Sequence, residues 1–129
     1  MGLAGLPSPP EENSVENIIT EVSNTPIEIP DATNKNIFII HADNRLNTDA
    51  TFIKLWNDDV VTYATEEPDI KFKMPASKQG AVRIPYSAAG GTAVITPENE
   101  KWWVATSSSS AVAGAAPTTA VDLRITREE

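Results

Sequence analysis

Asn36-Ile37-Phe38-Ile39-Ile40-His41-Ala42 is a mainly apolar run, and Ala50-Thr51-Phe52-Ile53-Lys54-Leu55-Trp56 follows it after seven mostly polar residues. Both runs are rich in β-branched or aromatic residues, and turn-forming residues lie between them. Runs of this length and composition are typical of buried strands. We therefore predict two strands of a buried sheet, joined by the polar loop of residues 43–49.

Other segments alternate apolar and polar side chains, as half-buried strands do. Residues 70–74 place Ile70, Phe72 and Met74 on one side and two lysines on the other, and residues 81–86 and 119–126 show the same period. Shorter strands are predicted at residues 25–30, 60–65, 92–96 and 101–106. About seven to nine short strands with turn signals between them predict an all-β, antiparallel β-sandwich of jelly-roll or Greek-key type.

The first 35 residues differ in composition from the rest of the chain. They hold six acidic residues and one basic residue, and three prolines near the start favour extended backbone. We predict an extended acidic N-terminal arm over residues 1–35 and a β-sandwich domain over residues 36–129. Residues 14–22 fit either one or two helical turns or a strand.

Length, charge and cysteine content limit the function. A chain of 129 residues can bury a core as one domain, and without cysteine it has no disulfide, thiol nucleophile or Cys-ligated metal. Its net charge of −8 disfavours nucleic acid as a partner. Residues 1–7 lack the segments of a secretory signal, and no run reaches the length of a membrane span. We expect a soluble protein, made in a cytoplasm, with no membrane partner.

His41 is the sole histidine and lies within the most apolar run. As a general base it needs a nucleophile and an orienting acid, and only Asp43 offers support, so a structural role is favoured. The loop with Asp43, Asn47 and Asp49 lacks the central glycine and closing glutamate of a calcium-binding loop, and no phosphate-binding glycine motif occurs. We predict that the protein is not an enzyme and has no catalytic residue, metal or cofactor.

The aromatic residues offer another function. Trp56, Tyr63, Tyr86, Trp102 and Trp103 on a β-sandwich can form a stacking platform for sugar rings, as in a glycan-binding module. Adjacent tryptophans in a strand face opposite sides, so only one of the last two can lie in the core. The simpler interpretation is that most of these rings fill the core, and Trp102 remains a candidate for an exposed aromatic contact.

Several stretches together carry a family resemblance. They are residues 24–29 and 37–42, 52–56, 80–85 with Gly90-Gly91, 102–106, the Ser/Ala-rich residues 107–117 and the closing residues 121–125. In these the chain resembles the small β-sandwich structural proteins of tailed bacteriophages. The resemblance implies a capsid decoration or cement subunit in a virion, or alternatively a collar, tail or head-fibre component, without catalytic residues.

An arm that cannot bury a core by itself gains stability by lying on a neighbour. We expect it to dock on the major capsid protein, another virion protein or a sister subunit of a homo-oligomer, with a trimer favoured. The predicted partner-binding residues are Leu3, Leu6, Pro7, Pro9, Pro10, Ile18, Ile19 and Val22.

Overall fold

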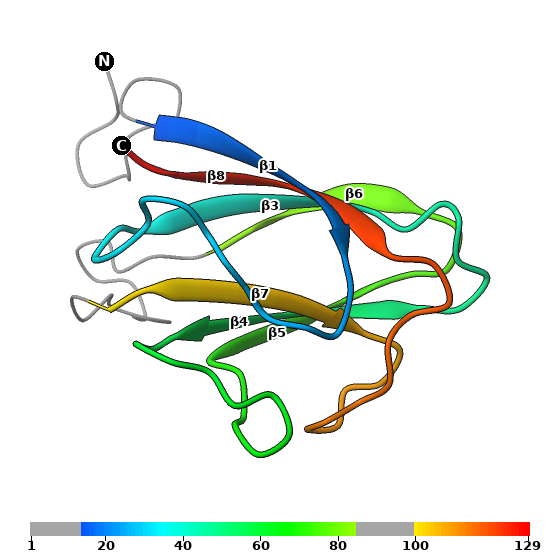
Figure 1. Cartoon of the computed structure of the whole chain (residues 1–129). Helices are drawn as coiled ribbons and strands as arrows, with labels where there is room; N and C mark the ends of the chain where they lie inside the picture. The colour runs from blue at the N-terminus through cyan, green and yellow to red at the C-terminus, as the bar shows by residue number, and fades with distance from the viewer. Residues whose placement is uncertain (1–13, 85–99) are drawn as a thin grey trace, which may run out of the picture.

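A computed structural model of the chain describes residues 14–84 and 100–129. These residues form eight strands: β1 (Ser14–Val22), β2 (Ile27–Glu28), β3 (Ile37–Asp43), β4 (Thr51–Asn57), β5 (Ile70–Met74), β6 (Gln79–Arg83), β7 (Trp102–Ser107) and β8 (Val121–Glu128). Figure 1 shows two layers, with β1, β8, β3 and β6 above β7, β4 and β5. The prediction of an all-β antiparallel sandwich is confirmed. The described part of the chain contains no helix of the length and apolarity that a membrane span requires.

The strand order is that of a jelly roll. One sheet has the order β1-β8-β3-β6 and the other has the order β2-β7-β4-β5, and all pairs are antiparallel. The first strand pairs with the last, the second with the seventh, the third with the sixth and the fourth with the fifth. This is the pairing of one long hairpin, which is rolled so that β8 also contacts β3 and β7 also contacts β4.

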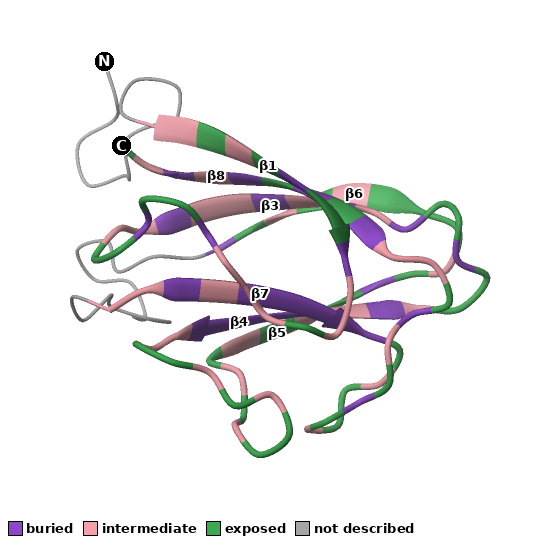
Figure 2. Cartoon of the chain, in the orientation of Figure 1, coloured by how far each residue is buried: buried purple, intermediate pink, exposed green. Residues whose placement is uncertain are grey.

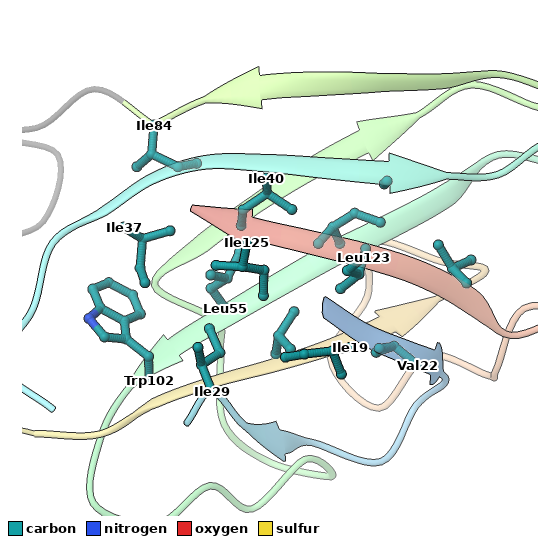
Figure 3. Packing of buried hydrophobic residues seen from close by; sticks show 14 of the residues in the cluster. Ile19, Val22, Ile29, Ile37, Ile40, Leu55, Ile84, Trp102, Leu123 and Ile125 are labelled. Atoms are coloured by element: carbon teal, nitrogen blue, oxygen red, sulfur yellow. The ribbon is translucent and has the colours of Figure 1, made fainter. Parts of the chain in front are cut away.

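The core lies between the sheets and is built by alternate residues of each strand. In β8, Val121, Leu123 and Ile125 are fully buried, whereas Asp122 and Arg124 between them are exposed. The contacting cluster comprises Ile19, Val22, Ile29, Ala32, Ile37, Ile40, Ala42, Ile53, Leu55, Met74, Ile84, Trp102, Val104, Val121, Leu123 and Ile125 (Figure 3). Burial of an aliphatic side chain of this size contributes about 1.5–3 kcal/mol, so this layer is the main source of stability.

The strands predicted at residues 36–42 and 50–56 form as β3 and β4, but they do not share a sheet. β3 pairs with β8 and β6, whereas β4 pairs with β7 and β5. The prediction of one buried sheet joined by a polar loop is therefore wrong. Residues 44–50 instead cross from one layer to the other, because rolling the hairpin places consecutive strands in opposite sheets.

A buried polar network holds this crossing. Asn44 is fully buried, and its Nδ2 donates to the carbonyl oxygens of Asp49, Met74 and Pro75 at 3.0–3.3 Å. Its Oδ1 accepts hydrogen bonds from Asn47 Nδ2 at 2.8 Å and from Thr51 Oγ1 at 2.6 Å. The asparagine thus joins three segments of the chain at one end of the sandwich.

The predicted boundary between an arm of residues 1–35 and a sandwich of residues 36–129 is wrong for residues 14–35. β1 pairs along β8 as part of the first sheet, and Ile29 and Ala32 lie in the core. A bulge between Ile19 and Val22, with Glu21 at a φ of 55°, lets both apolar side chains point inward although they are three residues apart. That spacing also suits a helix, which explains why residues 14–22 were ambiguous.

Two further strand predictions have different outcomes. Residues 60–65 form turns after β4 and no strand, because the preceding Asn-Asp-Asp sequence turns the chain away from the sheet. The predicted strand of residues 92–96, together with Tyr86, lies outside the described residues.

Candidate protein-interaction surface

The second sheet is covered on its outer side by the chain's own loops. Lys54 and Trp56 alternate with core residues of β4 and therefore point outward, yet each is only 1% exposed. Lys54 Nζ donates to the carbonyl oxygen of Ala111 at 2.7 Å, and Trp56 Nε1 donates to that of Glu66 at 3.1 Å. Residues 58–69 and 108–117 lie on this side, below the sheet in Figure 1.

Tyr63 connects these two loops. Its hydroxyl donates to the carbonyl oxygen of Gly114 at 2.7 Å, and its ring packs edge-on against Trp56 with 6.0 Å between centroids. The ammonium of Lys54 lies 5.2 Å from the centroid of the same ring, within the range of a cation–π interaction. The outer side of the second sheet is thus closed by specific contacts.

The first sheet is not covered in this way. Its outward side chains, which we call the open face, are Glu16, Ile18, Thr20, Ile39, His41, Asp43, Gln79, Ala81, Arg83, Asp122, Arg124 and Thr126. All are exposed or half-buried, and Figure 2 shows green and pink along β1 and β6 where β4 and β7 are mainly purple. Ile18, which is 67% exposed, is the largest apolar side chain on this face that is open to solvent.

The strand register arranges the open face in rows that run across the sheet. Arg124 of β8 stands opposite Ile18 of β1 and opposite His41 of β3. In the next row, Asp122 of β8 stands opposite Asp43 of β3. The row of Arg124 therefore lies beside a row that holds the carboxylates of Asp122 and Asp43, the second of which is paired with Arg45.

An open hollow of about 270 Å³ lies over these two rows. Its lining comprises Ile18, Thr20, His41, Asp43, Gln79, Asp122, Leu123 and Arg124, which come from all four strands of the sheet. The guanidinium of Arg124 makes no hydrogen bond or ion pair to the described residues. It is available to a carboxylate of another molecule.

Asp43 is held by Arg45 rather than by His41. Its carboxylate accepts hydrogen bonds from Arg45 Nε at 2.9 Å and Arg45 Nη2 at 2.8 Å, and also from the Arg45 backbone N–H at 3.1 Å. These hydrogen bonds hold the pKa of Asp43 at about 2, well below its usual value. Asp43 thus stays ionised, but it does not orient His41 as the acid of a catalytic pair.

Three of the four edge strands, β1, β2 and β5, are less suited to binding than the open face. β1 carries a bulge and the acidic residues Glu16 and Glu21, and β2 has only two residues. The other edge of the second sheet, β5, presents Lys71 and Lys73 to solvent. Charges, bulges and short strands at edges are the features that prevent unwanted strand pairing.

The predicted partner-binding residues fall into three groups. Ile18 lies on the open face, where a partner can reach it. Ile19 and Val22 are buried in the core, so their assignment as partner contacts is wrong, because this side of β1 packs on its own sandwich. Leu3, Leu6, Pro7, Pro9 and Pro10 lie outside the described residues.

The prediction of an exposed Trp102 is also wrong. Its side chain is 2% exposed and its Nε1 donates to the carbonyl oxygen of Lys35 at 2.7 Å, because β7 turns this tryptophan inward and its neighbour outward. Trp103 is half-buried, with its Nε1 bonded to the carbonyl oxygen of Asp58 at 3.0 Å. Together with the buried Trp56, these contacts leave no tryptophan platform for a sugar among the described residues.

No group of three or more His, Asp or Glu residues with the spacing of a metal site occurs in residues 14–84 and 100–129. Asn47, in the loop with Asp43 and Asp49, bonds Asn44 and the backbone of Thr119 instead of a metal. Sequence reasoning missed the role of Asp122 and Arg124. Their alternation in residues 119–126 marks them as outward, but only the register places them beside Asp43 and His41.

These features define a jelly-roll domain with one covered and one open sheet face. No family model and no curated protein matches the sequence. Among solved structures, the chain is similar to the coat protein of Tobacco streak virus, with 12% sequence identity and a TM-score of 0.41 over 92% of this chain and 88% of the coat protein. At this identity and TM-score, the similarity says nothing about what this chain binds.

Proposed function

We propose that the chain is a non-enzymatic structural protein of a virion and acts as a capsid decoration or cement subunit. The proposal starts from the resemblance of residues 24–126 to the small β-sandwich structural proteins of tailed bacteriophages. A collar, tail or head-fibre position is the alternative within the same class of protein.

The observation that carries the proposal is the difference between the two sheet faces. The second sheet is closed by loops that Lys54, Trp56 and Tyr63 hold in place. The first sheet presents an uncovered surface of mixed charge with Ile18 within it. Polar and charged surfaces of this type set the specificity and orientation of protein contacts more than their affinity. A subunit of an assembly needs such a contact surface.

The segment before β1 is the second element of the proposal. β1 is the outermost strand of the open sheet, so residues 1–13 join the domain at its edge. We propose that Leu3, Leu6 and the three prolines of this segment contact the major capsid protein. Prolines restrict the backbone before binding, which lowers the entropy lost when the segment is ordered on a partner.

Purification of virus particles tests this function. The particles are isolated on a density gradient from the cells that make the chain. We expect the chain to sediment with the particles at a fixed ratio to the major capsid protein, and antibody against it to label the outer surface of the capsid. Label confined to one vertex or to the tail favours the collar or tail alternative. Recovery of the chain only in the particle-free fractions contradicts the proposal.

A variant without residues 1–13 tests the docking segment separately. We expect it to fold but to be lost from the particles. The matched control is Lys73→Asp, because it changes an exposed charge on β5, far from both proposed contacts, and is expected to leave incorporation unchanged. Full incorporation of the shortened chain contradicts the role of residues 1–13.

A further inference from the structure

We infer that the open face binds a second copy of this chain in a face-to-face contact with two-fold symmetry. The inference rests on the proposed function only in treating the open face as a contact surface. It is carried by the charge pattern of the two central rows, in which Arg124 lies one row away from Asp122, whereas Asp43, in the row of Asp122, is already paired with Arg45.

The rows are arranged so that the face is complementary to itself. Residues two apart on one strand lie about 7 Å apart on the same side of a sheet. A two-fold axis that lies in the interface, between the rows and parallel to them, exchanges the rows and keeps each strand facing its own copy. Asp122 then faces Arg124 of the second copy, and Asp43 faces His41 of the second copy. Each contact occurs twice, as an isologous interface requires.

The apolar side chain on this face fits the same operation. Ile18 and Thr20 are two residues apart on β1 and lie on the same side of the sheet. The rotation therefore places Ile18 against Thr20 of the second copy. Ile18 is thereby removed from water together with the methylene groups of Arg124, its cross-strand neighbour. Sheets that pack face to face keep their strands within about 30° of alignment, which leaves the row pairing intact near the axis.

Other occupants fit the face less well. A purely acidic or basic partner would meet a charge of its own sign, because Asp122 and Arg124 lie in neighbouring rows. Strand addition at β1 is disfavoured by its bulge and its glutamates. A second copy matches both rows at once.

Self-association of the isolated full chain tests the inference, measured by sedimentation velocity over a concentration series at low ionic strength. We expect a monomer–dimer equilibrium that weakens when salt is raised from about 0.05 M to about 0.5 M. Arg124→Asp places like charges opposite each other twice, and we expect it to weaken dimerisation at least about tenfold. Asp122→Arg is expected to weaken dimerisation equally, because two positive charges then face each other at positions 122 and 124.

Mixing the two variants provides the decisive measurement. In the mixed pair, both charges introduced at positions 122 and 124 meet charges of opposite sign, so the dimer is expected to return to within about threefold of the original affinity. Circular dichroism is to be measured to check that each variant is folded, which matters because Asp122 also accepts a hydrogen bond from the Glu21 backbone N–H. Lys73→Asp on the other sheet is the matched control and is expected to dimerise normally.

Three results overturn the inference: a monomer at all concentrations, a dimer or trimer that Arg124→Asp leaves unchanged, or a failure of the mixed variants to associate when both are folded. These results are distinct from failure of the proposed function. A chain that dimerises but never sediments with particles refutes the virion role alone. A chain that decorates particles as a monomer refutes the dimer alone.

Discussion

Asn47 Nδ2 donates a 2.8 Å hydrogen bond to Asn44 Oδ1 at a site closed to water, within the loop of residues 44–50 that crosses the sandwich. The same Asn44 oxygen accepts from Thr51, and Asn47 also bonds both the N–H and the carbonyl oxygen of Thr119. The side chains of this network thus bond backbone N–H and carbonyl groups that a neighbouring strand would bond in a regular β-sheet. This network makes the crossing from β3 to β4 possible.

Asn44→Ala should therefore destabilise the fold by about 2–4 kcal/mol, because it leaves several buried polar groups without partners. Chemical denaturation with a two-state fit measures the free energy of unfolding. Asn24→Ala, at a half-buried asparagine outside the network, is the control and should cost less than about 0.5 kcal/mol. A loss for Asn44→Ala as small as that of the control would show that the network does not hold the crossing.

Two deletions should separate the docking segment from the fold. Removal of residues 1–13 leaves β1 intact, so the thermal unfolding transition should stay cooperative. Removal of residues 1–23 deletes β1 with the core residues Ile19 and Val22 and exposes the edge of β8. Loss of a leucine-sized core side chain costs about 2–5 kcal/mol, so loss of two should unfold most of the protein. A stable, soluble product of the longer deletion would contradict the role of β1.

Gly114→Ala should loosen the loop of residues 108–117. A β-carbon at this position would clash with Ser107 Oγ, which itself bonds the carbonyl oxygens of Ser109 and Ala115. We expect a loss of about 1–3 kcal/mol from overpacking, with faster amide exchange in the loop. Gly80→Ala is the matched control, because the nearest atom to a β-carbon there is 4.0 Å away, and it should be neutral or slightly stabilising.

Acid should weaken the fold partly through Asp43. Hydrogen bonds from Arg45 lower the pKa of its carboxyl group to about 2 in the folded protein. Its contribution to the free energy of unfolding is therefore fully present above the pKa that this carboxyl has in the unfolded chain, and it is lost as the pH falls from about 4 to about 2. The contribution is small, since the pair is partly exposed and solvent screens it. Arg45→Gln should flatten this part of the stability curve and raise the pKa of Asp43 in an NMR titration. An unchanged titration would refute the pairing.

The alternation of residues 70–74, 81–86 and 119–126 was enough to predict strands, because side chains of a strand alternate between a wet and a buried side whatever the topology. The i, i+3 spacing of Ile19 and Val22 could not be assigned in the same way. A bulge and a helical turn produce that spacing alike, and only the pairing of β1 with β8 distinguishes them.

The amino-acid sequence by itself determined that this chain is an all-β sandwich with a core of β-branched residues, since local periodicity and turn residues act within a few positions of the chain. Tertiary structure alone decided that residues 36–42 and 50–56 lie in different sheets, that Trp102 faces inward, and that Asp122 lies beside Arg124 on an open face with His41 and Asp43. These relationships join residues as far apart in the chain as His41 and Arg124, so no local pattern encodes them. They follow from the strand register and from the way the hairpin is rolled, and both depend on packing of the whole core between the two sheets.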